Sequence, residues 1–363
     1  MTPAVPSIAH PFADAPDPLA AAFALDVAAG FSRVPKTIPP RWLYDDLGSA
    51  LFEAICRLPW YRITRAERAL LASHGRAILD AVPGPIEIVE LGGGNGEKLD
   101  CLLDAGRDTS DIRVRLVDIS QAALDTARDR LLSRDAPPPI ELTRASYDLA
   151  LSSLPPTPHS RLVVFLGSNI GNFDPDEAEA LLHAMAAAAS GRGAILLGVD
   201  LVKPERDLLL AYDDPLGVTA AFNRNLLARM NRDLGANVPL DAFAHRAIWN
   251  ADASRVEMHL VAGRDVEFVI PAAAVRTRMA RGEYIWTESS YKYSRTGIES
   301  LARETGLRID RQWIDPLAGF ALSLLKARTT ESFDGAPRSA LRGGAARRAG
   351  ARRRRGHEPA REA

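Results

Sequence analysis

The sequence predicts an α/β fold built on a doubly wound, mainly parallel sheet, with an antiparallel hairpin at one edge and a second α+β domain. Three observations lead to this fold class. Strand-like and helical segments alternate from residue 86 to residue 200, which is the pattern of βαβ units. A glycine-rich turn follows the first of these strands, and two strand-like segments close the folded part of the 363-residue chain. A chain of this length can bury a large core.

Helices are expected before the first strand. Their ranges are 19–31, 47–57 and 64–81. The prolines within residues 35–40 predict an extended stretch between the first two helices. Thr64 and Glu67 have the spacing of a capping box, so the third helix is expected to begin with Thr64 as its N-cap.

The alternating segments define the central sheet. The predicted strands are 86–91, 112–118, 140–144, 161–167 and 194–200. The helices expected between them are 96–105, 120–133 and 175–189. An amphipathic helix at 295–305 and strands at 307–314 and 320–326 follow near the end. Because a short turn joins these last two strands, we expect them to form an antiparallel hairpin.

A long insertion separates the last parallel strand from the final helix. Its predicted segments are a helix at 216–235 and strands at 254–261, 265–270 and 283–293. An insertion after the carboxyl end of a strand lies over the crevice where α/β sheets bind ligands. We therefore expect a ligand-binding domain of residues 62–202 and 290–328, and a substrate lid domain of residues 19–61 and 203–289. Residues 1–18 and 332–363 are expected to be disordered.

Charge and composition limit the function classes. The net charge is −1, but residues 338–363 hold nine arginines and two glutamates, so this tail carries +7 and the rest of the chain −8. An acidic body argues against a nucleic-acid-binding catalytic face and leaves RNA contact to the tail alone. The two cysteines, Cys56 and Cys101, provide neither a disulfide framework nor metal-ligand spacing. With no signal peptide and no membrane span, a cytoplasmic monomer without metal or membrane contact is expected.

The glycine turn carries the strongest functional signal. A strand ends at Glu90 and is followed by glycines and then by a helical pattern. A dinucleotide fingerprint would need its third glycine at Glu97, which disfavours a nicotinamide oxidoreductase. A carboxylate at the strand end suits a ligand with an amino group and a ribose, such as S-adenosylmethionine (SAM); the alternative is a loop that binds nothing. The predicted cofactor residues of this turn are Glu90, Gly92, Gly94 and Gly96.

Further residues can complete the cofactor site. Asp118 ends the second strand and could accept hydrogen bonds from ribose hydroxyls, or it could cap the next helix. Lys98 could bind the cofactor carboxylate, although a solvated surface lysine fits the spacing almost as well. Ser146 and Tyr147 follow the third strand, where either an adenine contact or an ordinary loop is possible.

Two later segments suggest substrate chemistry. Asn169 and Asn172 follow the strand at 161–167 and could accept hydrogen bonds from an amine, or they could form an Asx turn. Glu288, Ser290 and Lys292 alternate along a predicted strand and therefore share one face. That face could read a ring N–H, although an exposed strand face is the simpler interpretation of the alternation alone.

Together these motifs resemble the histidine Nα-methyltransferases of ergothioneine biosynthesis. The resemblance runs from about Val34 to Lys326 and implies a class I methyltransferase, Rossmann-like fold. The blocks that carry it are PKTIPP at 35–40, YDDLGS at 44–49, LPWY at 58–61, TRAE at 64–67, the glycine turn with Lys98, FLGSNIGN at 165–172, DLVK at 200–203, AYDD at 211–214, VTAAFNRN at 218–225 and TESS at 287–290. The chain departs from the family at Ser146-Tyr147, where Asp-Phe is frequent, and at Ser289, where an apolar residue is usual.

The resemblance implies SAM as methyl donor and the α-amine of L-histidine as acceptor, with three successive transfers that yield hercynine. The residues it places around the cofactor are Gly92, Lys98, Asp118, Ser146 and Tyr147. It implies that Asn172 and Tyr44 hold the amine as the catalytic pair, and that Tyr212 holds the carboxylate. The residues it places elsewhere in the substrate pocket are Tyr61, Thr219, Glu288 and Ser290, the last two on the imidazole nitrogens.

Two alternatives remain open from the sequence. One is the same fold acting on another aromatic amino acid or on a histidine derivative. The other is a non-catalytic SAM-binding regulator whose basic tail contacts RNA.

Overall fold

The computed structural model describes residues 18–105, 109–189 and 191–328. The segments predicted to be disordered, 1–18 and 332–363, lie outside the described residues apart from Pro18. Within the described ranges, no helix has the length and hydrophobicity needed to cross a membrane.

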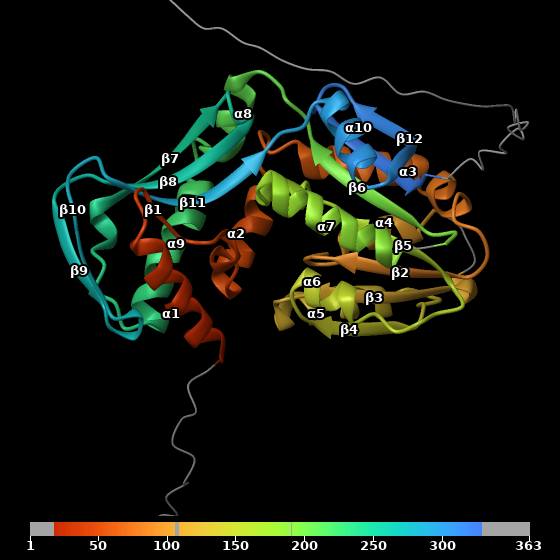
Figure 1. Ribbon diagram of the computed structural model, residues 1–363, viewed down its shortest axis with the longest axis horizontal. Coiled ribbons are helices and arrows are strands. Elements are labelled where there is room, and N and C mark those ends of the chain that lie inside the picture. The colour runs from red at the N-terminus through yellow and green to blue at the C-terminus, as the bar shows by residue number, and fades with distance from the viewer. Residues whose placement is uncertain (1–17, 106–108, 190, 329–363) are drawn as a thin grey trace, which may run out of the picture. The chain divides into compact units, whose positions relative to one another are not determined.

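The larger sheet has seven strands in the order β12-β13-β6-β5-β2-β3-β4 (Figure 1). Its strands are β2 (Ile86–Leu91), β3 (Ile112–Asp118), β4 (Ile140–Arg144), β5 (Ser160–Phe165), β6 (Ala194–Asp200), β12 (Leu307–Asp315) and β13 (Phe320–Ala327). Strands β2 to β6 pair in parallel, whereas β13 is antiparallel to both β6 and β12. This order confirms the predicted doubly wound sheet with an antiparallel edge hairpin, as in the class I methyltransferase fold.

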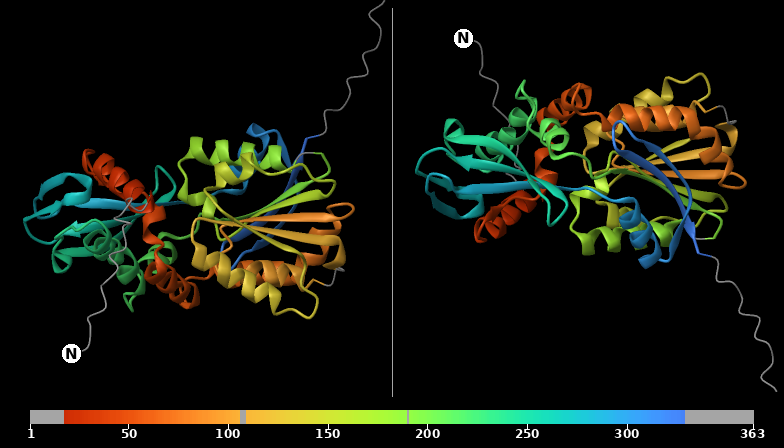
Figure 2. Two further views of the ribbon diagram at one scale, coloured as in Figure 1. Left: turned by 90° about the horizontal axis from the view of Figure 1, so that it is seen from below. Right: turned by 90° about the horizontal axis from the view of Figure 1, so that it is seen from above.

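Helices cover both faces of this sheet (Figure 2). One face carries α3 (Ile63–Asp80), α4 (Glu97–Leu103) and α5 (Gln121–Leu132), and the other carries α6 (Tyr147–Ser152), α7 (Pro175–Ala188) and α10 (Arg295–Glu304). Every residue of β2 is buried. Ile86 and Ile88 join the apolar core on the α3 side, and Val89 and Leu91 join the core on the α7 side. Such two-sided burial is expected of a central parallel strand.

A second sheet has the order β1-β11-β8-β7, and β9 and β10 form a separate hairpin. The strands are β1 (Lys36–Thr37), β7 (Phe243–Asn250), β8 (Arg255–Ala262), β9 (Val266–Ile270), β10 (Val275–Met279) and β11 (Tyr284–Tyr291). Helices α1 (Pro18–Phe31), α2 (Asp46–Arg57), α8 (Glu205–Tyr212) and α9 (Val218–Asp233) accompany them (Figure 1). The elements absent from the sequence prediction are α6, α8, β7 and β10.

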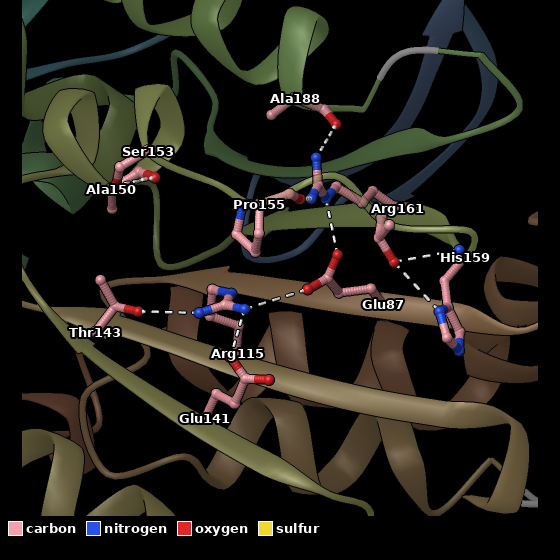
Figure 3. Close-up of polar contacts among 11 residues, drawn as sticks. Glu87, Arg115, Glu141, Thr143, Ala150, Ser153, Pro155, His159, Arg161 and Ala188 are labelled. Atoms are coloured by element: carbon pink, nitrogen blue, oxygen red, sulfur yellow. Dashed lines mark hydrogen bonds and ion pairs between the residues drawn. The ribbon is translucent and has the colours of Figure 1, made fainter.

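A buried charge network lies near the amino ends of the larger sheet's strands (Figure 3). Glu87 of β2 is 2% exposed and lies between arginines of the two neighbouring strands. Arg161 Nε donates to Glu87 Oε2 at 2.8 Å, and Arg115 Nη2 lies 3.6 Å from Glu87 Oε1. Arg115 also pairs with the half-exposed Glu141 of β4 at 2.5 Å. The network joins four strands at the end of the sheet opposite the glycine turn.

Candidate active site

The turn after β2 brings backbone, a carboxyl group and a phenol together. Its glycines with φ in the left-handed region, which favours glycine, are Gly92 at 66°, Gly94 at 58° and Gly96 at 73°. A Cβ atom on Gly92 would lie 2.2 Å from the Tyr147 hydroxyl oxygen, and one on Gly93 would lie 2.2 Å from Glu90 Oε2. The glycines therefore both shape the turn and leave room for these two side chains.

Glu90 is a buried carboxyl group that the described residues do not fully satisfy. It is 1% exposed, and its Oε2 has no hydrogen-bond partner among the residues that the structure describes. Burial raises the pKa of Glu90 to about 7; Lys98 opposes this shift and Asp118 reinforces it. Leaving such an oxygen unpaired is costly, so the position fits a ligand that donates a hydrogen bond there.

Asp118 and Tyr147 lie near the same carboxyl group. Asp118 Oδ1 accepts a hydrogen bond from the Ser120 backbone N–H at 2.9 Å, while Ser120 itself caps α5 with its hydroxyl. Asp118 is therefore not the helix cap. Burial raises the pKa of Tyr147, and the charges of Asp118 and Glu90 raise it further. Ser146, the residue before Tyr147, is exposed.

Lys98 is paired with a carboxylate that the sequence prediction assigned to another role. Lys98 Nζ lies 2.7 Å from Glu67 Oε2, and Glu67 is fully buried. Both Glu67 oxygens also accept from the backbone N–H of Gly167 at 2.9 Å. Helix α3 begins at Ile63 without a side-chain cap, so the predicted capping box of Thr64 and Glu67 is wrong. Burial disfavours the Lys98 charge, but Glu67 outweighs burial and raises the pKa of Lys98.

The loop after β5 lies between the two sheets. Residues Asn169–Asn172 form a short 3-10 helix. Asn169 Nδ2 donates to the Gly92 carbonyl oxygen at 3.5 Å, which connects this loop to the glycine turn. A Cβ atom on Gly171 would lie 2.6 Å from the Tyr291 carbonyl oxygen, so the loop also touches β11. The loop that carries Asn172 thus connects the cofactor candidates to β11.

Three tyrosines from distant segments come together. The Tyr44 ring lies 5.4 Å from Phe222, and the Tyr61 ring lies 6.3 Å from Tyr212, measured between centroids. Phe52 packs edge-on against both Tyr44 and Tyr61. Burial raises the pKa of Tyr44 and Tyr61 well above 10, so both are neutral hydroxyls near pH 7.

Strand β11 supplies the polar side of this cluster. Glu288, Ser290 and Lys292 are 7%, 3% and 4% exposed, so the interpretation of this face as solvent-exposed is wrong. Glu288 Oε2 has no hydrogen-bond partner among the described residues. Burial raises the pKa of Glu288 to about 7, and Lys292 partly opposes the shift. A β-bulge between Trp286 and Glu288 changes the register of the strand immediately before this carboxyl group.

Ser290 is part of a buried hydroxyl pair. Its Oγ lies 2.8 Å from the Tyr212 hydroxyl oxygen, and Lys292 Nζ donates to both oxygens at 2.8 Å. Asp200, the last residue of β6, lies 3.1 Å from Lys292 Nζ through its Oδ2. A cavity of about 300 Å³ adjoins Tyr212 and Asp200 and is also lined by Tyr61.

A hydrogen-bond chain connects the β11 bulge to Tyr212. The Thr287 hydroxyl donates to Asn223 Oδ1 at 2.7 Å, and Asn223 Nδ2 lies 2.9 Å from His245 Nδ1. His245 Nε2 lies 2.8 Å from the Tyr212 carbonyl oxygen. Burial lowers the pKa of His245, so the neutral ring accepts at Nδ1 and donates at Nε2. Thr219, by contrast, lies in the first turn of α9, where its backbone N–H donates to Asp214.

The comparison with known protein families decides the identity. A family model described as "Histidine-specific methyltransferase, SAM-dependent" matches residues 23–327. The chain belongs to this family. It is 40% identical to the histidine N-alpha-methyltransferase of Mycolicibacterium smegmatis over 312 residues, which cover 85% of this chain and 96% of that protein. The corresponding Mycobacterium tuberculosis enzyme is 38% identical over 301 residues, covering 82% and 93%.

A third relative of this methyltransferase is larger. It is the ergothioneine biosynthesis protein 1 of Neurospora crassa, which is 28% identical over 294 residues. The match covers 77% of this chain and 32% of that protein.

SAM is the methyl donor of the family, and the residues of this methyltransferase fit it. The unpaired Glu90 Oε2 requires a hydrogen-bond donor, and the glycine turn keeps side chains away from the backbone beside it. Asp118 lies near enough to Glu90 to raise its pKa. These features suit a ligand with hydroxyl and amino groups, which SAM provides.

The structure adds residues that the sequence reasoning missed. Glu67 had been assigned to a helix cap, and no local pattern indicates its pairing with Lys98. Asp200 contributes through a contact between the two sheets, which a single sequence does not reveal. Lys292 did carry a signal, because its alternation with Glu288 and Ser290 placed it on their face.

Proposed function

We propose that this methyltransferase transfers methyl groups from SAM to the α-amine of L-histidine, in three successive steps that yield hercynine for ergothioneine biosynthesis. The observation that carries the proposal is Glu288. It is a buried carboxyl group with one oxygen that has no hydrogen-bond partner in the described part of the chain. It lies on the strand that supplies Ser290, in a chain of the histidine-specific family. An imidazole N–H is a directional donor for such an oxygen.

The cofactor roles follow the glycine turn. SAM supplies an electrophilic methyl group. We assign its binding to Glu90, Gly92, Gly94, Gly96, Lys98, Asp118, Ser146 and Tyr147. In this assignment Asp118 accepts from the ribose hydroxyls, and Lys98, held by Glu67, faces the carboxylate end. Tyr147 contributes its aromatic ring. Ser146 lies exposed immediately before α6, where a ligand can reach it.

The substrate roles follow the tyrosine cluster and β11. We assign the α-amine to Asn172 and Tyr44 as the catalytic pair, and the carboxylate to Tyr212. Glu288 and Ser290 hold the imidazole nitrogens. The remaining pocket walls are Tyr61 and Thr219. Segments 19–61 and 203–289 then act as the substrate lid over the domain formed by residues 62–202 and 290–328.

The chemistry is a displacement at carbon. The amine lone pair forms the new N–C bond while the C–S bond breaks, and the amine proton leaves to solvent. An α-amine is mostly protonated at pH 7, since its pKa is roughly 8. Asn172 and the neutral Tyr44 hydroxyl accept hydrogen bonds from the amine without adding a charge that favours the ammonium form. Positioning by these groups can supply about 7–11 kcal/mol of the barrier reduction.

The setting of the enzyme is part of the proposal. We propose that it works as a monomer on a small-molecule substrate, without nucleic acid, membrane or metal. Cys56 and Cys101 are free thiols, which supports a reducing, cytoplasmic compartment.

Mass spectrometry with a panel of acceptors tests the proposal. The protein is incubated with SAM and, separately, with L-histidine, L-tryptophan, L-phenylalanine and L-histidine methyl ester. We expect histidine alone to gain one, two and three methyl groups efficiently. Preference for another amino acid would overturn the substrate assignment, and SAM binding without any methylated product would support the regulator instead.

A further inference from the structure

The proposed mechanism gives no role to Lys292, a buried cation beside the substrate candidates. The Lys292 side chain is 0% exposed. Its Nζ has three close acceptors, namely the Tyr212 and Ser290 hydroxyl oxygens at 2.8 Å and Asp200 Oδ2 at 3.1 Å. These acceptors match the three N–H groups of an ammonium, so Lys292 has none left for a ligand.

Hydrogen counting limits what the hydroxyl pair can offer to a substrate. An ammonium group only donates, so both hydroxyl oxygens accept from Lys292. The two oxygens are also 2.8 Å apart, so one hydroxyl donates to the other. The Tyr212 and Ser290 hydroxyl groups together carry two hydrogens, and one of these forms the hydrogen bond between them. A single hydroxyl hydrogen remains for the substrate.

Either of the two hydroxyl groups can direct this remaining hydrogen to the substrate. If Ser290 keeps it, Tyr212 donates to Ser290 and has nothing to donate to a carboxylate. If Tyr212 keeps it, Ser290 donates to Tyr212 and offers only a lone pair to the substrate. A carboxylate accepts hydrogen bonds and does not donate them, so it selects the second arrangement. Ser290 and Glu288 then both present acceptors to the ring.

We propose that Lys292 is a positioning residue that clamps the Tyr212–Ser290 pair, so that histidine binds with hydrogen on both ring nitrogens. The inference rests on the proposed function, with Tyr212 on the carboxylate and Ser290 on the ring. One ring N–H donates to Glu288 and the other to Ser290 Oγ. The imidazolium ring also gives the buried Glu288 carboxylate a counter-charge, which a buried ion needs.

Asp200 completes the clamp. Its carboxylate balances the buried Lys292 charge, and its backbone N–H donates to Ser168 Oγ at 2.9 Å. The Tyr293 backbone N–H donates to the Asp200 carbonyl oxygen at 3.0 Å. The clamp is therefore anchored to the carboxyl end of β6, next to the loop that carries Asn172, and it fixes the substrate relative to the cofactor sheet.

Double variants test the clamp without leaving Lys292 or Asp200 as an unpaired buried ion. K292M/D200N removes both of these charges and leaves Lys203, whose Nζ lies 2.5 Å from Asp200 Oδ1, without its carboxylate. K326M/D310N is the matched control, because it removes a Lys–Asp pair, 3.2 Å apart, on the β12–β13 hairpin and leaves Arg308, 2.8 Å from Asp310, in the same way. Each protein is saturated with S-adenosylhomocysteine and titrated with ring-¹⁵N-labelled L-histidine at a pH above the imidazole pKa of roughly 6.5. Calorimetry gives the histidine and SAM Kd values, and ¹⁵N chemical shifts report whether each bound ring nitrogen carries hydrogen.

We expect both bound nitrogens to carry hydrogen in the full-length wild type and in K326M/D310N. In K292M/D200N no ammonium donates to the two hydroxyl oxygens, so the pair is no longer held together and Ser290 can turn its hydrogen towards the ring. We therefore expect one bare ring nitrogen, a histidine Kd raised by about 10- to 100-fold, and an unchanged SAM Kd. Y212F provides a second test if K292M/D200N does not fold. In Y212F the outward hydrogen passes to Ser290, so one bare ring nitrogen is again expected.

A bare ring nitrogen in the wild-type complex would overturn the inference. So would normal histidine affinity in folded K292M/D200N, or a fully protonated ring in Y212F. In each of these cases wild-type methylation of histidine keeps the proposed function intact. Wild-type protein that binds SAM but no histidine would instead overturn the proposed function itself.

Discussion

At the scale of single residues, the site depends on buried carboxyl groups that the protein leaves partly unpaired. Glu90 and Glu288 each retain one oxygen without a partner among the described residues, and each has a pKa raised to about 7 by burial. A folded chain keeps such groups at a cost in stability. The cost is understandable if ligands satisfy both oxygens, because a ligand lacking the right donor then leaves the carboxyl group unpaired and binds weakly.

Replacing Glu288 tests its assigned role directly. Glu288→Ala should raise the Kd for histidine by about 10- to 100-fold, because a charge-assisted hydrogen bond to the ring is lost. The SAM Kd should not change. Calorimetry with each ligand measures both, and Glu53→Gln, at an exposed position on α2, is the control. Unchanged histidine affinity in Glu288→Ala would remove this carboxyl group from imidazole recognition.

The raised pKa of Glu288 also predicts how stability depends on pH. Between the ordinary value of 4.5 and about 7, the folded protein holds this proton and the unfolded chain does not. The free energy of unfolding therefore falls as pH rises through this window. Glu288→Gln has no such proton, so its stability relative to wild type should increase from pH 5 to pH 8, by roughly 3 kcal/mol at most.

Urea unfolding of the ligand-free proteins at the two pH values provides the measurement. Glu53→Gln should keep a constant difference from wild type. The same constant difference in Glu288→Gln would argue that Glu288 is solvated and charged in the folded state.

At the scale of secondary-structure elements, the sequence correctly predicted those strands whose bounds depend on the residues within and beside them. The bounds of β2, β3 and β6 match the prediction because apolar runs define them, with glycines on the flanks of β2 and β6. Strand β7 was missed because its alternation is interrupted by His245, which is accommodated through hydrogen bonds to Asn223 and Tyr212. The capping box failed because Glu67 gains more from Lys98 and Gly167 than from its own helix terminus.

In the candidate site, too, the sequence indicated the residues with local signals and not those whose placement depends on packing between distant segments. The glycine turn and Asp118 are visible in the sequence because their roles follow from positions at strand ends. Tyr44, Tyr61 and Tyr212 have no local signal, and their grouping depends on packing between α2, α8 and α9. Only the family resemblance indicated them from the sequence.

The proposed cofactor role of Lys98 extends to helix α3, because Glu67 of this helix pairs with Lys98. In Glu67→Gln, Lys98 loses its carboxylate partner, and we expect the SAM Kd to rise by about 10-fold. The histidine Kd, measured with S-adenosylhomocysteine at saturation, should change little. Thr64→Ala is the matched control, because replacing Thr64 should change the SAM Kd only if the predicted capping box held Glu67 in place. Equal SAM affinity in Glu67→Gln and wild type would show that Lys98 needs no partner.

We expect the charge network in Figure 3 to contribute to the stability of the fold and not to catalytic activity. Glu87→Gln leaves Arg115 and Arg161 buried without their shared carboxylate and should lower the free energy of unfolding by about 3 kcal/mol. Glu141→Gln, at the half-exposed end of the network, should cost less than about 1 kcal/mol. Both variants should keep the wild-type kcat/KM. A loss of activity in folded Glu87→Gln would connect this end of the sheet to the site.

At the scale of the whole molecule, the two sheets divide the chemistry. The carboxyl ends of β2, β3 and β4 present the cofactor candidates, and β11 with the tyrosine cluster and Asn172 presents the substrate candidates. The contacts between them run through Asp200, Lys292 and the loop Asn169–Asn172. This division predicts an orientation, with the imidazole held at β11 and the α-amine directed towards the methyl donor.

The position of the transferred methyl group tests that orientation most directly. L-Histidine is incubated with the protein and SAM carrying a deuterated methyl group, and the products are analysed by NMR and tandem mass spectrometry. The account predicts that every label lies on the α-nitrogen, in products with one, two and three methyl groups. Label on a ring nitrogen, or no label on histidine at all, would contradict it.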